Sequence, residues 1–379
     1  MRTQLHDRQD RRSALSPFAP RRVRAFAERK PTLVSTATLI FLSSIFLSSP
    51  ARAQKPDPEK SAATMIAPAR KSIDKGLAWL ASRQSDDGSF GRGAYGGNVG
   101  VCALAGMAFM AGGSTPGRGP YGQQVTRTVD YLLANCQQSG YVIEPNPTRH
   151  GPMYGHGFAT LFLAECYGMS PRPELREKLS KAVKLIVNTQ NLEGEKRGGW
   201  RYEPQRGDAD VSVTACQVMA LRAAANAGIS VPKETIDRSI DYVKRCRNAD
   251  GGFAYMASGG ESAFPRSAAA LVALYSAGQY QGSEITKGLD YLMQSVPSPD
   301  LVRRSDSYYE YGHYYAVQAM WQAGGEQWQK WYPAVRDELI ARQRQDGSWE
   351  SSAISNEYAA AMCLIVLQMP ENQLPIFQR

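Results

Sequence analysis

The feature that most constrains this fold is a pattern that returns six times, with a period of roughly 50 residues. Each copy has a first segment that alternates charged and apolar residues, a turn with glycine and an aromatic residue, and a second, alanine-rich apolar segment. The first segments lie at 73–84, 125–137, 178–190, 235–246, 284–295 and 334–343, and the second at 99–113, 157–169, 212–228, 266–278, 313–325 and 357–369. Apolar residues at helical spacing within such a period predict stacked helical hairpins.

The two segments of each hairpin predict different surroundings. The second segments are apolar nearly all round, so we expect them to be buried on every side. The first segments are amphipathic, so we expect one of their faces to meet solvent. Six buried helices inside six amphipathic ones form an all-α α/α toroid, with an open solenoid as the alternative. We favour the toroid over residues 66–379, because a closed ring needs no polar capping repeats.

The net charge of +9 is concentrated at the N-terminus. Residues 1–53 carry ten Lys or Arg against three acidic residues, a net charge of +7, which leaves only +2 for residues 54–379. Nucleic-acid binding requires a basic surface, so the charge distribution excludes that class of function. The 43% content of hydrophobic residues excludes a disordered chain.

Residues 1–53 have the layout of a secretory signal peptide with a long basic region. Arg29 and Lys30 precede an apolar run over residues 33–47, and Ala51-Arg52-Ala53 form an A-x-A cleavage site. We expect cleavage near Ala53 and export to the periplasm or the medium, with an uncleaved membrane anchor as the alternative. Residues 54–65 are polar and contain proline, which predicts a linker. No later segment has the roughly 18 continuous apolar residues of a transmembrane helix.

Six cysteines follow the signal peptide, and all of them are widely separated along the chain: Cys102, Cys136, Cys166, Cys216, Cys246 and Cys363. This spacing excludes a C-x-x-C zinc or redox site. Most lie in apolar helical segments, so we expect buried thiols that pack as small hydrophobic groups. One or two disulfides are the alternative in an oxidising compartment, without a pairing that the sequence can specify.

The turns repeat glutamine, glycine and an aromatic residue in order: Gln84 before Gly88-Ser89-Phe90, Gln190 before Gly198-Gly199-Trp200, and Gln343 before Gly347-Ser348-Trp349. This pattern resembles the Gln–Trp repeat of the squalene and terpenoid cyclases, which are related to the β-subunits of protein prenyltransferases. Glutamine at a helix end can bond free backbone groups, and the aromatic residue can pack back over the turn. We therefore expect Trp200 and Trp349 to stabilise turns. Residues 295–306 replace this turn in the fifth hairpin.

In a toroid of this kind, the N-termini of the inner helices meet at one mouth, where their N–H groups create a positive potential. We predict ligand binding there by Tyr154, His156, Arg266, Tyr308, Tyr309 and His313, with Asn98, Asp306, Tyr314, Asn356 and Glu357 as further candidates. His156 has an alternative role as a loop or N-cap residue. The five tyrosines within residues 305–322 either line a ligand site or pack between the inner and outer helices.

Asp208-Ala209-Asp210 precedes the third inner helix. It resembles the Asp-x-Asp-Asp-Thr-Ala motif of squalene–hopene-type cyclases, in which a neutral carboxylic acid protonates an alkene, although Val211 replaces the third acid. The resemblance implies that Asp210 is the proton donor and Asp208 its hydrogen-bonding neighbour. Alternatively, Asp210 is only an N-cap, ionised and held by helix N–H groups with its pKa below the usual value. We expect this second state.

We predict no metal site and no cofactor. Protein prenyltransferases bind zinc through an Asp-x-Cys pair, and no cysteine of this chain has an aspartate two residues before it. Three functions remain: an exported toroid that binds an isoprenoid, a glycan or a partner without the family's full catalytic set; a terpenoid cyclase that uses Asp208 and Asp210; and a carbohydrate-active α6/α6 enzyme. The missing third acid favours the first.

Overall fold

The computed structural model describes residues 58–147, 151–169, 172–298, 308–351 and 353–378. The predicted signal peptide, His150 and Asp306 therefore lie outside the described residues. The described part of the chain consists of helices, turns and isolated β-bridges. None of its helices is both long enough and apolar enough to cross a bilayer.

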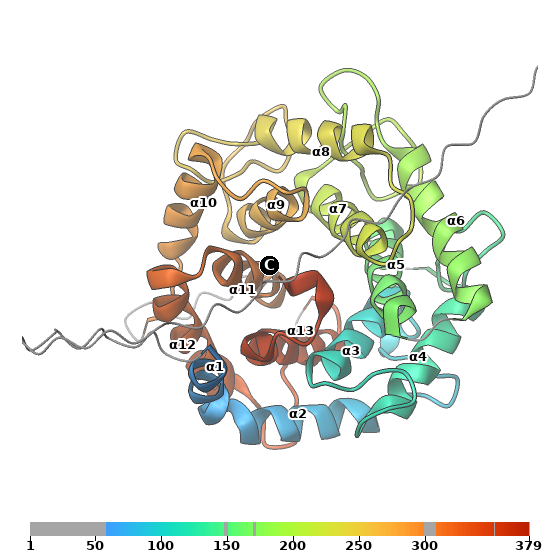
Figure 1. Ribbon diagram of the computed structural model, residues 1–379, viewed down its shortest axis with the longest axis vertical. Helices are drawn as coiled ribbons and strands as arrows, with labels where there is room; N and C mark the ends of the chain where they lie inside the picture. Colours follow the sequence, from blue (N-terminus) through green and yellow to red (C-terminus); the bar gives the residue numbers. More distant parts are fainter. Residues whose placement is uncertain (1–57, 148–150, 170–171, 299–307, 352, 379) are drawn as a thin grey trace, which may run out of the picture. The chain divides into compact units, whose positions relative to one another are not determined.

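Twelve of the described helices form two concentric rings (Figure 1). The outer ring consists of α2 (Arg70–Ser82), α4 (Gly122–Ala134), α6 (Pro173–Thr189), α8 (Lys233–Arg245), α10 (Ser283–Met293) and α12 (Gly325–Arg342). The inner ring consists of α3 (Val99–Ala111), α5 (Pro152–Met169), α7 (Val211–Asn226), α9 (Phe264–Ser276), α11 (Tyr309–Ala323) and α13 (Asn356–Gln368). The predicted all-α α/α toroid of six hairpins is confirmed.

The ring is closed between the last hairpin and the first. Each inner helix packs against the next one, and α13 packs against α3. The Gln343 side chain donates to the Ser72 carbonyl at 2.9 Å, and the Ser72 hydroxyl donates to Gln343 Oε1 at 2.7 Å. Gln368 of α13 donates to the Ala108 carbonyl of α3 at 3.1 Å. These contacts exclude the open solenoid.

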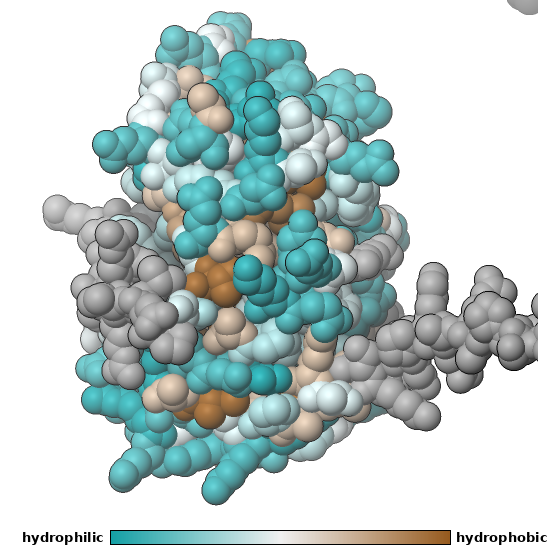
Figure 2. Space-filling model, turned by 90° about the vertical axis from the view of Figure 1, so that its left-hand side faces the viewer, coloured by the Kyte–Doolittle hydropathy of each residue, from teal (hydrophilic) through white to brown (hydrophobic). Residues whose placement is uncertain are grey.

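The two rings differ in burial as their patterns predict. All 13 residues of α3 are buried, whereas the outer helix α8 buries only Thr235, Ser239, Tyr242 and Val243. Figure 2 shows the side of the molecule that lies at the left of Figure 1, near α10 and α12. Hydrophilic residues cover most of the described surface there, and hydrophobic residues appear only in small separate areas. The apolar surface of the hairpins is thus directed inward.

The Gln–Trp pairs bind each turn to two outer helices. Gln190 donates to the Gly198 carbonyl of its own turn at 3.0 Å and to the Thr235 carbonyl of the next outer helix at 2.9 Å. Trp200 is 1% exposed, and its indole N–H donates to the Ile186 carbonyl of the preceding outer helix at 2.7 Å. The glutamine therefore joins neighbouring hairpins, while the tryptophan closes its own.

The other Gln–Trp turns make corresponding bonds. Gln84 donates to the Gly88 carbonyl and to the Gln124 carbonyl, both at 3.0 Å. The Trp349 indole donates to the Leu339 carbonyl at 2.8 Å. The prediction that Trp200 and Trp349 stabilise turns is consistent with these positions, because both indoles are buried against their own hairpins.

The turn glycines allow the hairpins to approach one another. Gly198 has φ +95°, and a Cβ atom there would lie 1.9 Å from the Arg238 carbonyl oxygen of α8. The corresponding glycines Gly88, Gly140, Gly251 and Gly347 also have positive φ, and a Cβ on each would lie 2.3 to 2.6 Å from the backbone of the next outer helix. Only glycine fits this combination of conformation and contact.

Residues 58–66, most of which we expected to be a linker, form helix α1 (Pro58–Ile66) instead. It leads into the 3-10 turn η1 (Ala67–Ala69) and packs against η3 (Met369–Glu371). Ile66 is 1% exposed, so tertiary packing supports a helix that its polar sequence did not suggest. All six cysteines are free thiols, and all but the partly exposed Cys136 are buried, as predicted.

Candidate functional site

The N-termini of the inner helices meet at one end of the ring, as the sequence predicts; we call this end the N-terminal mouth. The ring of Tyr154, on α5, lies 6.3 Å from that of Tyr311, on α11. Gly100 of α3 packs against Gly155 of α5. The predicted candidate Asn98 caps α3 by accepting hydrogen bonds from the N–H groups of residues 100 and 101 at 3.1 Å.

Asp210 is the N-cap of α7. Its Oδ1 accepts hydrogen bonds from the N–H of Ser212 at 2.9 Å and of Val213 at 2.8 Å. The residue is fully buried. The capping role that the sequence offered as the alternative to catalysis is therefore present in the structure.

Arg201 and four residues around it form the polar centre of the mouth; we call Arg201, Tyr202, Asp208, Asp210 and Tyr255 the Arg201 cluster. The guanidinium lies 2.9 Å from Asp208 Oδ2 and 3.3 Å from Asp210 Oδ2. Its carbon lies 4.6 Å from the centre of the Tyr202 ring and 5.2 Å from that of Tyr255. The Tyr255 hydroxyl donates a hydrogen bond to Asp210 Oδ2 at 3.3 Å, and the hydroxyls of Tyr202 and Tyr255 are hydrogen-bonded to each other.

The environment of Asp210 contradicts one expectation from the sequence. Burial raises the pKa of its carboxyl to about 6, although the N–H groups of Val213 and Ser212 and the Arg201 guanidinium oppose this shift. We expected a lowered pKa, because Val211 replaces the third acid of the motif and leaves less negative charge to raise the pKa of the pair. A charged Asp208 is not the cause of the raised pKa, since Asp208 is 44% exposed and ion-paired with Arg201.

His156, a predicted binding residue, makes contacts within the chain with both ring nitrogens. Its Nδ1 accepts a hydrogen bond from the Val142 N–H at 3.1 Å, and its Nε2 lies 3.3 Å from the Ala182 carbonyl oxygen of α6. The ring is fully buried, and burial lowers its pKa to about 4. In the next two hairpins, Thr214 and Ser267 occupy the equivalent position, and each accepts a hydrogen bond from a turn N–H, of Trp200 or Phe253.

Three further predicted binding residues are also occupied by contacts within the chain. Arg266 donates to the carbonyls of Phe253 and Glu261. The ring of Tyr309 lies 3.8 Å from the guanidinium of Arg342, and that of His313 lies 4.3 Å from Tyr309 and 5.5 Å from Trp331 of α12. These contacts join the inner helices to turns or to α12. The Tyr309 hydroxyl and His313 Nδ1 are nevertheless buried without a hydrogen-bond partner among the described residues.

The remaining two predicted binding residues, Tyr308 and Tyr154, differ in their exposure to solvent. Tyr308 is 63% exposed at the N-cap of α11. Tyr154 is partly buried beside the Arg201 cluster, with its ring 6.2 Å from that of Tyr202. Of the six predicted binding residues, Tyr154 is the one that the structure brings to the Arg201 cluster.

Aromatic side chains fill the ring behind the mouth. Tyr314 and Tyr315 are fully buried, with ring centres 4.9 Å apart. Phe158 lies 5.9 Å from Tyr314, and Tyr311 lies 4.8 Å from Tyr315. The tyrosines of the fifth hairpin thus mainly pack the core. Three pockets that the described residues form all lie away from Asp210, one at the opposite mouth and two in turn regions of the outer ring.

The acid on α13 is paired as well. Glu357 is 2% exposed, with its Oε1 3.5 Å from Arg83 Nε and 3.7 Å from Arg92 Nε. Neighbouring Asn356 accepts a hydrogen bond from the Ser351 N–H. Across the described residues, no three His, Cys, Asp or Glu side chains gather as a metal site would require.

The sequence did not single out Arg201, Tyr202 or Tyr255, although a signal for them exists. Tyr202 follows the turn aromatic Trp200 at the second position, and Tyr255 follows Phe253 with the same offset. Glu144 has the equivalent place after Val142, and it accepts a hydrogen bond from the Asn98 amide at 2.7 Å. The second position after the turn residue therefore marks the residues of the mouth in three consecutive hairpins.

Two family models match consecutive parts of the chain. The prenyltransferase α/α toroid domain matches residues 60–193, and the squalene-hopene cyclase C-terminal domain matches residues 158–300. Parts of the chain therefore match two domain families of α/α toroids, those of the prenyltransferases and of the squalene–hopene cyclases. The described helices between residues 70 and 368 form one such toroid.

Solved structures share this toroid fold at low sequence identity. The type II terpene cyclase MstE from Scytonema, in complex with geranylgeranyl dihydroxybenzoate, has a TM-score of 0.57 and 12% identity, covering 83% of this chain and 99% of MstE. An α-mannanase from Bacteroides thetaiotaomicron has a TM-score of 0.61 and 9% identity, covering 83% and 98%. Cellobiose 2-epimerase from Bacillus thermoamylovorans has a TM-score of 0.58 and 14% identity, and the match covers 80% of this chain and 99% of the epimerase. No curated protein matches the chain.

Proposed function

We propose that this toroid binds a hydroxyl-bearing ligand, a saccharide unit, at the N-terminal mouth and does not cyclise an isoprenoid. The observation that carries the proposal is that both carboxylate oxygens of Asp210 already have partners within the protein. Its Oδ1 accepts two backbone hydrogen bonds, and its Oδ2 contacts both Arg201 and Tyr255. A general acid must present its proton to the substrate, and this carboxyl is committed to the protein on both oxygens.

The chemistry of the Arg201 cluster favours a saccharide over an isoprenoid. Arg201, Tyr202, Asp208 and Tyr255 are all partly exposed, so donors, acceptors and aromatic faces meet at one place. Sugar hydroxyls need such directed polar groups, and a ligand pocket fixes orientation with a few of them. An isoprenoid would need an apolar cavity, whereas aromatic side chains fill the centre of this ring. The mannanase and epimerase neighbours agree with a sugar ligand, and the terpene cyclase neighbour agrees with an isoprenoid, so the choice between them rests on the cluster itself.

Titration of the purified protein against a panel of oligosaccharides tests the proposal. We expect binding of at least one saccharide, and a tenfold or greater loss of affinity, about 1.4 kcal/mol or more, in Asp208→Asn and Tyr202→Phe. Asp250→Asn and Tyr280→Phe are the matched controls outside the cluster, and they should leave affinity unchanged. Absence of binding across the panel would contradict the proposal. Release of shorter saccharides would assign a carbohydrate-active enzyme instead.

The second candidate is a terpenoid cyclase, and one observation favours it. Burial raises the pKa of Asp210 to about 6, which is the direction that a general acid requires. The same protein should therefore be incubated with squalene and with geranylgeranyl substrates. We expect no cyclised product. A product that forms with the parent and with Asp208→Asn, but not with Asp210→Asn, would replace the binding function by acid catalysis.

We also propose that the protein is exported. The support is the basic pair Arg29-Lys30, the apolar run over residues 33–47 and the site Ala51-Arg52-Ala53. The mature protein should be recovered outside the cytoplasm with Gln54 as its first residue, as N-terminal sequencing would reveal. An intact Met1 on cytoplasmic protein would rule out export.

A further inference from the structure

The opposite end of the ring, where the inner helices have their C-termini, is covered by the chain itself; we call it the C-terminal mouth. The covering segment is residues 374–378, which include the 3-10 turn η4 (Pro375–Phe377) packed against α7. Leu374 is 1% exposed and Phe377 is 4% exposed, so both side chains are inserted into the mouth.

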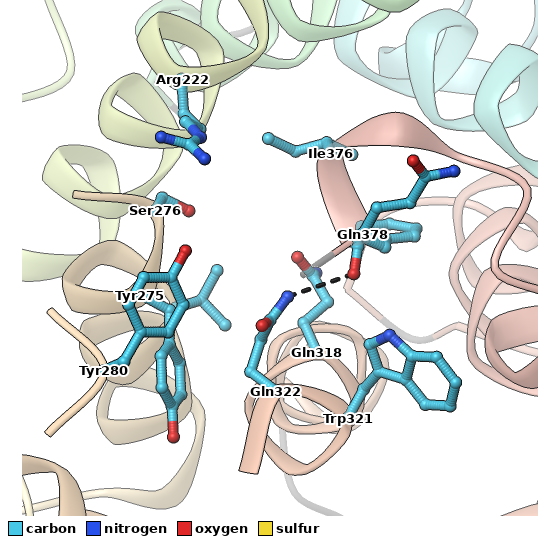
Figure 3. Close-up of a pocket in the computed structure, with 11 residues that line it drawn as sticks. Arg222, Tyr275, Ser276, Tyr280, Gln318, Trp321, Gln322, Ile376 and Gln378 are labelled. Atoms are coloured by element: carbon cyan, nitrogen blue, oxygen red, sulfur yellow. Dashed lines mark hydrogen bonds between the residues drawn. The ribbon is translucent and has the colours of Figure 1, made fainter. Parts of the chain in front are cut away.

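Side chains of two inner helices form hydrogen bonds with the backbone of this segment. Glu165 of α5 accepts a hydrogen bond from the Ile376 N–H at 3.3 Å. Gln322 of α11 donates to the Phe377 carbonyl at 3.1 Å, as Figure 3 shows. Glu165 is 4% exposed, and this burial raises its pKa to about 7. Hydrogen bonds to backbone groups do not depend on which side chains the segment carries, so another peptide could form the same bonds.

The segment leaves part of this site unused. A pocket of about 20 Å³ lies beside it, with room for a group of roughly one or two water molecules. In Figure 3 the guanidinium of Arg222 points into this space opposite Ile376. No ion pair joins Arg222 to a described carboxylate. Gln322 Oε1 is buried without a hydrogen-bond partner among the described residues. Residues 372–378 carry no charge that could meet Arg222.

Asn372 separates the segment from the 3-10 turn η3. It has φ 50° and is the one non-glycine residue with positive φ among the described residues. Asparagine adopts this left-handed conformation more readily than most residues, and here it ends η3. Its Oδ1 is buried without a partner within the described part of the chain.

We propose that the C-terminal mouth is a peptide-binding site, which residues 374–378 occupy in cis. A peptide that adopts the same 3-10 turn, with two apolar side chains and an acidic residue between them, displaces the segment. The acidic residue takes the place of Ile376 and pairs with Arg222. Such a ligand gains an ion pair that the cis segment lacks, while it keeps the backbone contacts with Glu165 and Gln322. This site is at the opposite end of the ring from the Arg201 cluster, so it stands independently of the saccharide proposal.

Fluorescence anisotropy with two end-blocked peptides of residues 374–378 tests the proposal on the full chain. One peptide has the native sequence, and the other carries Ile376→Glu. We expect the acidic peptide to bind at least tenfold more tightly. Arg222→Gln should abolish this preference, whereas Arg118→Gln, at an exposed arginine elsewhere, should preserve it. Equal affinity for both peptides, or a preference that survives Arg222→Gln, would overturn the proposal.

Displacement has its own readout. In the variant Phe377→Ala, the cis segment competes less well, so either peptide should bind at least tenfold more tightly than to the parent. If that variant does not fold, hydrogen–deuterium exchange on the parent gives the answer. Saturating acidic peptide should accelerate exchange of the Ile376 amide, which Glu165 protects, at least tenfold. Unchanged exchange at saturation would show that the segment is a fixed part of the fold and not a displaceable ligand.

Discussion

Replacement of either buried turn tryptophan should cost the protein about 3–5 kcal/mol of unfolding free energy. Trp200→Ala removes an indole that is 1% exposed, and Trp349→Ala removes one that is 2% exposed. Each change leaves a cavity in the hairpin and an outer-helix carbonyl, of Ile186 or Leu339, without its hydrogen bond. Urea denaturation followed by circular dichroism measures the loss.

Trp79→Ala is the matched control for the tryptophan variants. Trp79 is partly exposed on the outer helix α2, and its ring packs against Arg83. We expect a loss of roughly 1–2 kcal/mol, because part of this ring already meets water. If Trp200→Ala or Trp349→Ala melts within a degree or two of the parent, the turn tryptophans do not hold the hairpins together.

Gly198→Ala should destabilise the protein by about 3 kcal/mol or more. Two effects add at this position. The φ of +95° lies in the left-handed region, which costs an alanine conformational energy. The new Cβ would also lie 1.9 Å from the Arg238 carbonyl oxygen, so the third turn and α8 must separate. We expect the melting temperature to fall by an amount that differential scanning calorimetry detects.

Gly228→Ala separates the two effects. Gly228 has φ +82°, and a Cβ atom there would meet no heavy atom within 4 Å. Its replacement carries only the backbone strain, for which we expect about 1–2 kcal/mol. Equal losses for Gly198→Ala and Gly228→Ala would mean that the close approach of turn and outer helix contributes nothing.

Some positions of the candidate site follow from local sequence, and others do not. The cap at Asp210 was predictable, because an aspartate directly before an apolar helix needs only its own neighbours to act. The position of His156 depends on the helix boundary. We expected that helix to begin at residue 157, whereas α5 begins at Pro152. The earlier start places His156 within the helix, where both ring nitrogens meet backbone atoms of the turn and of α6.

The sequence by itself determined the fold, because each hairpin repeats the same local information. Helical periodicity separates inner from outer helices, and Gln190, Gly198 and Trp200 and their counterparts fix the turns. Only the tertiary structure decided which side chains meet at the candidate site and how the pKa of Asp210 shifts. Arg201 reaches Asp210 across a turn, and the pKa of Asp210 rises because surrounding helices exclude water. Residues 374–378 cover the C-terminal mouth through partners on α5 and α11, which are remote from them in the sequence. Burial and distance between remote segments set pKa values and site composition, and neither is encoded in local patterns.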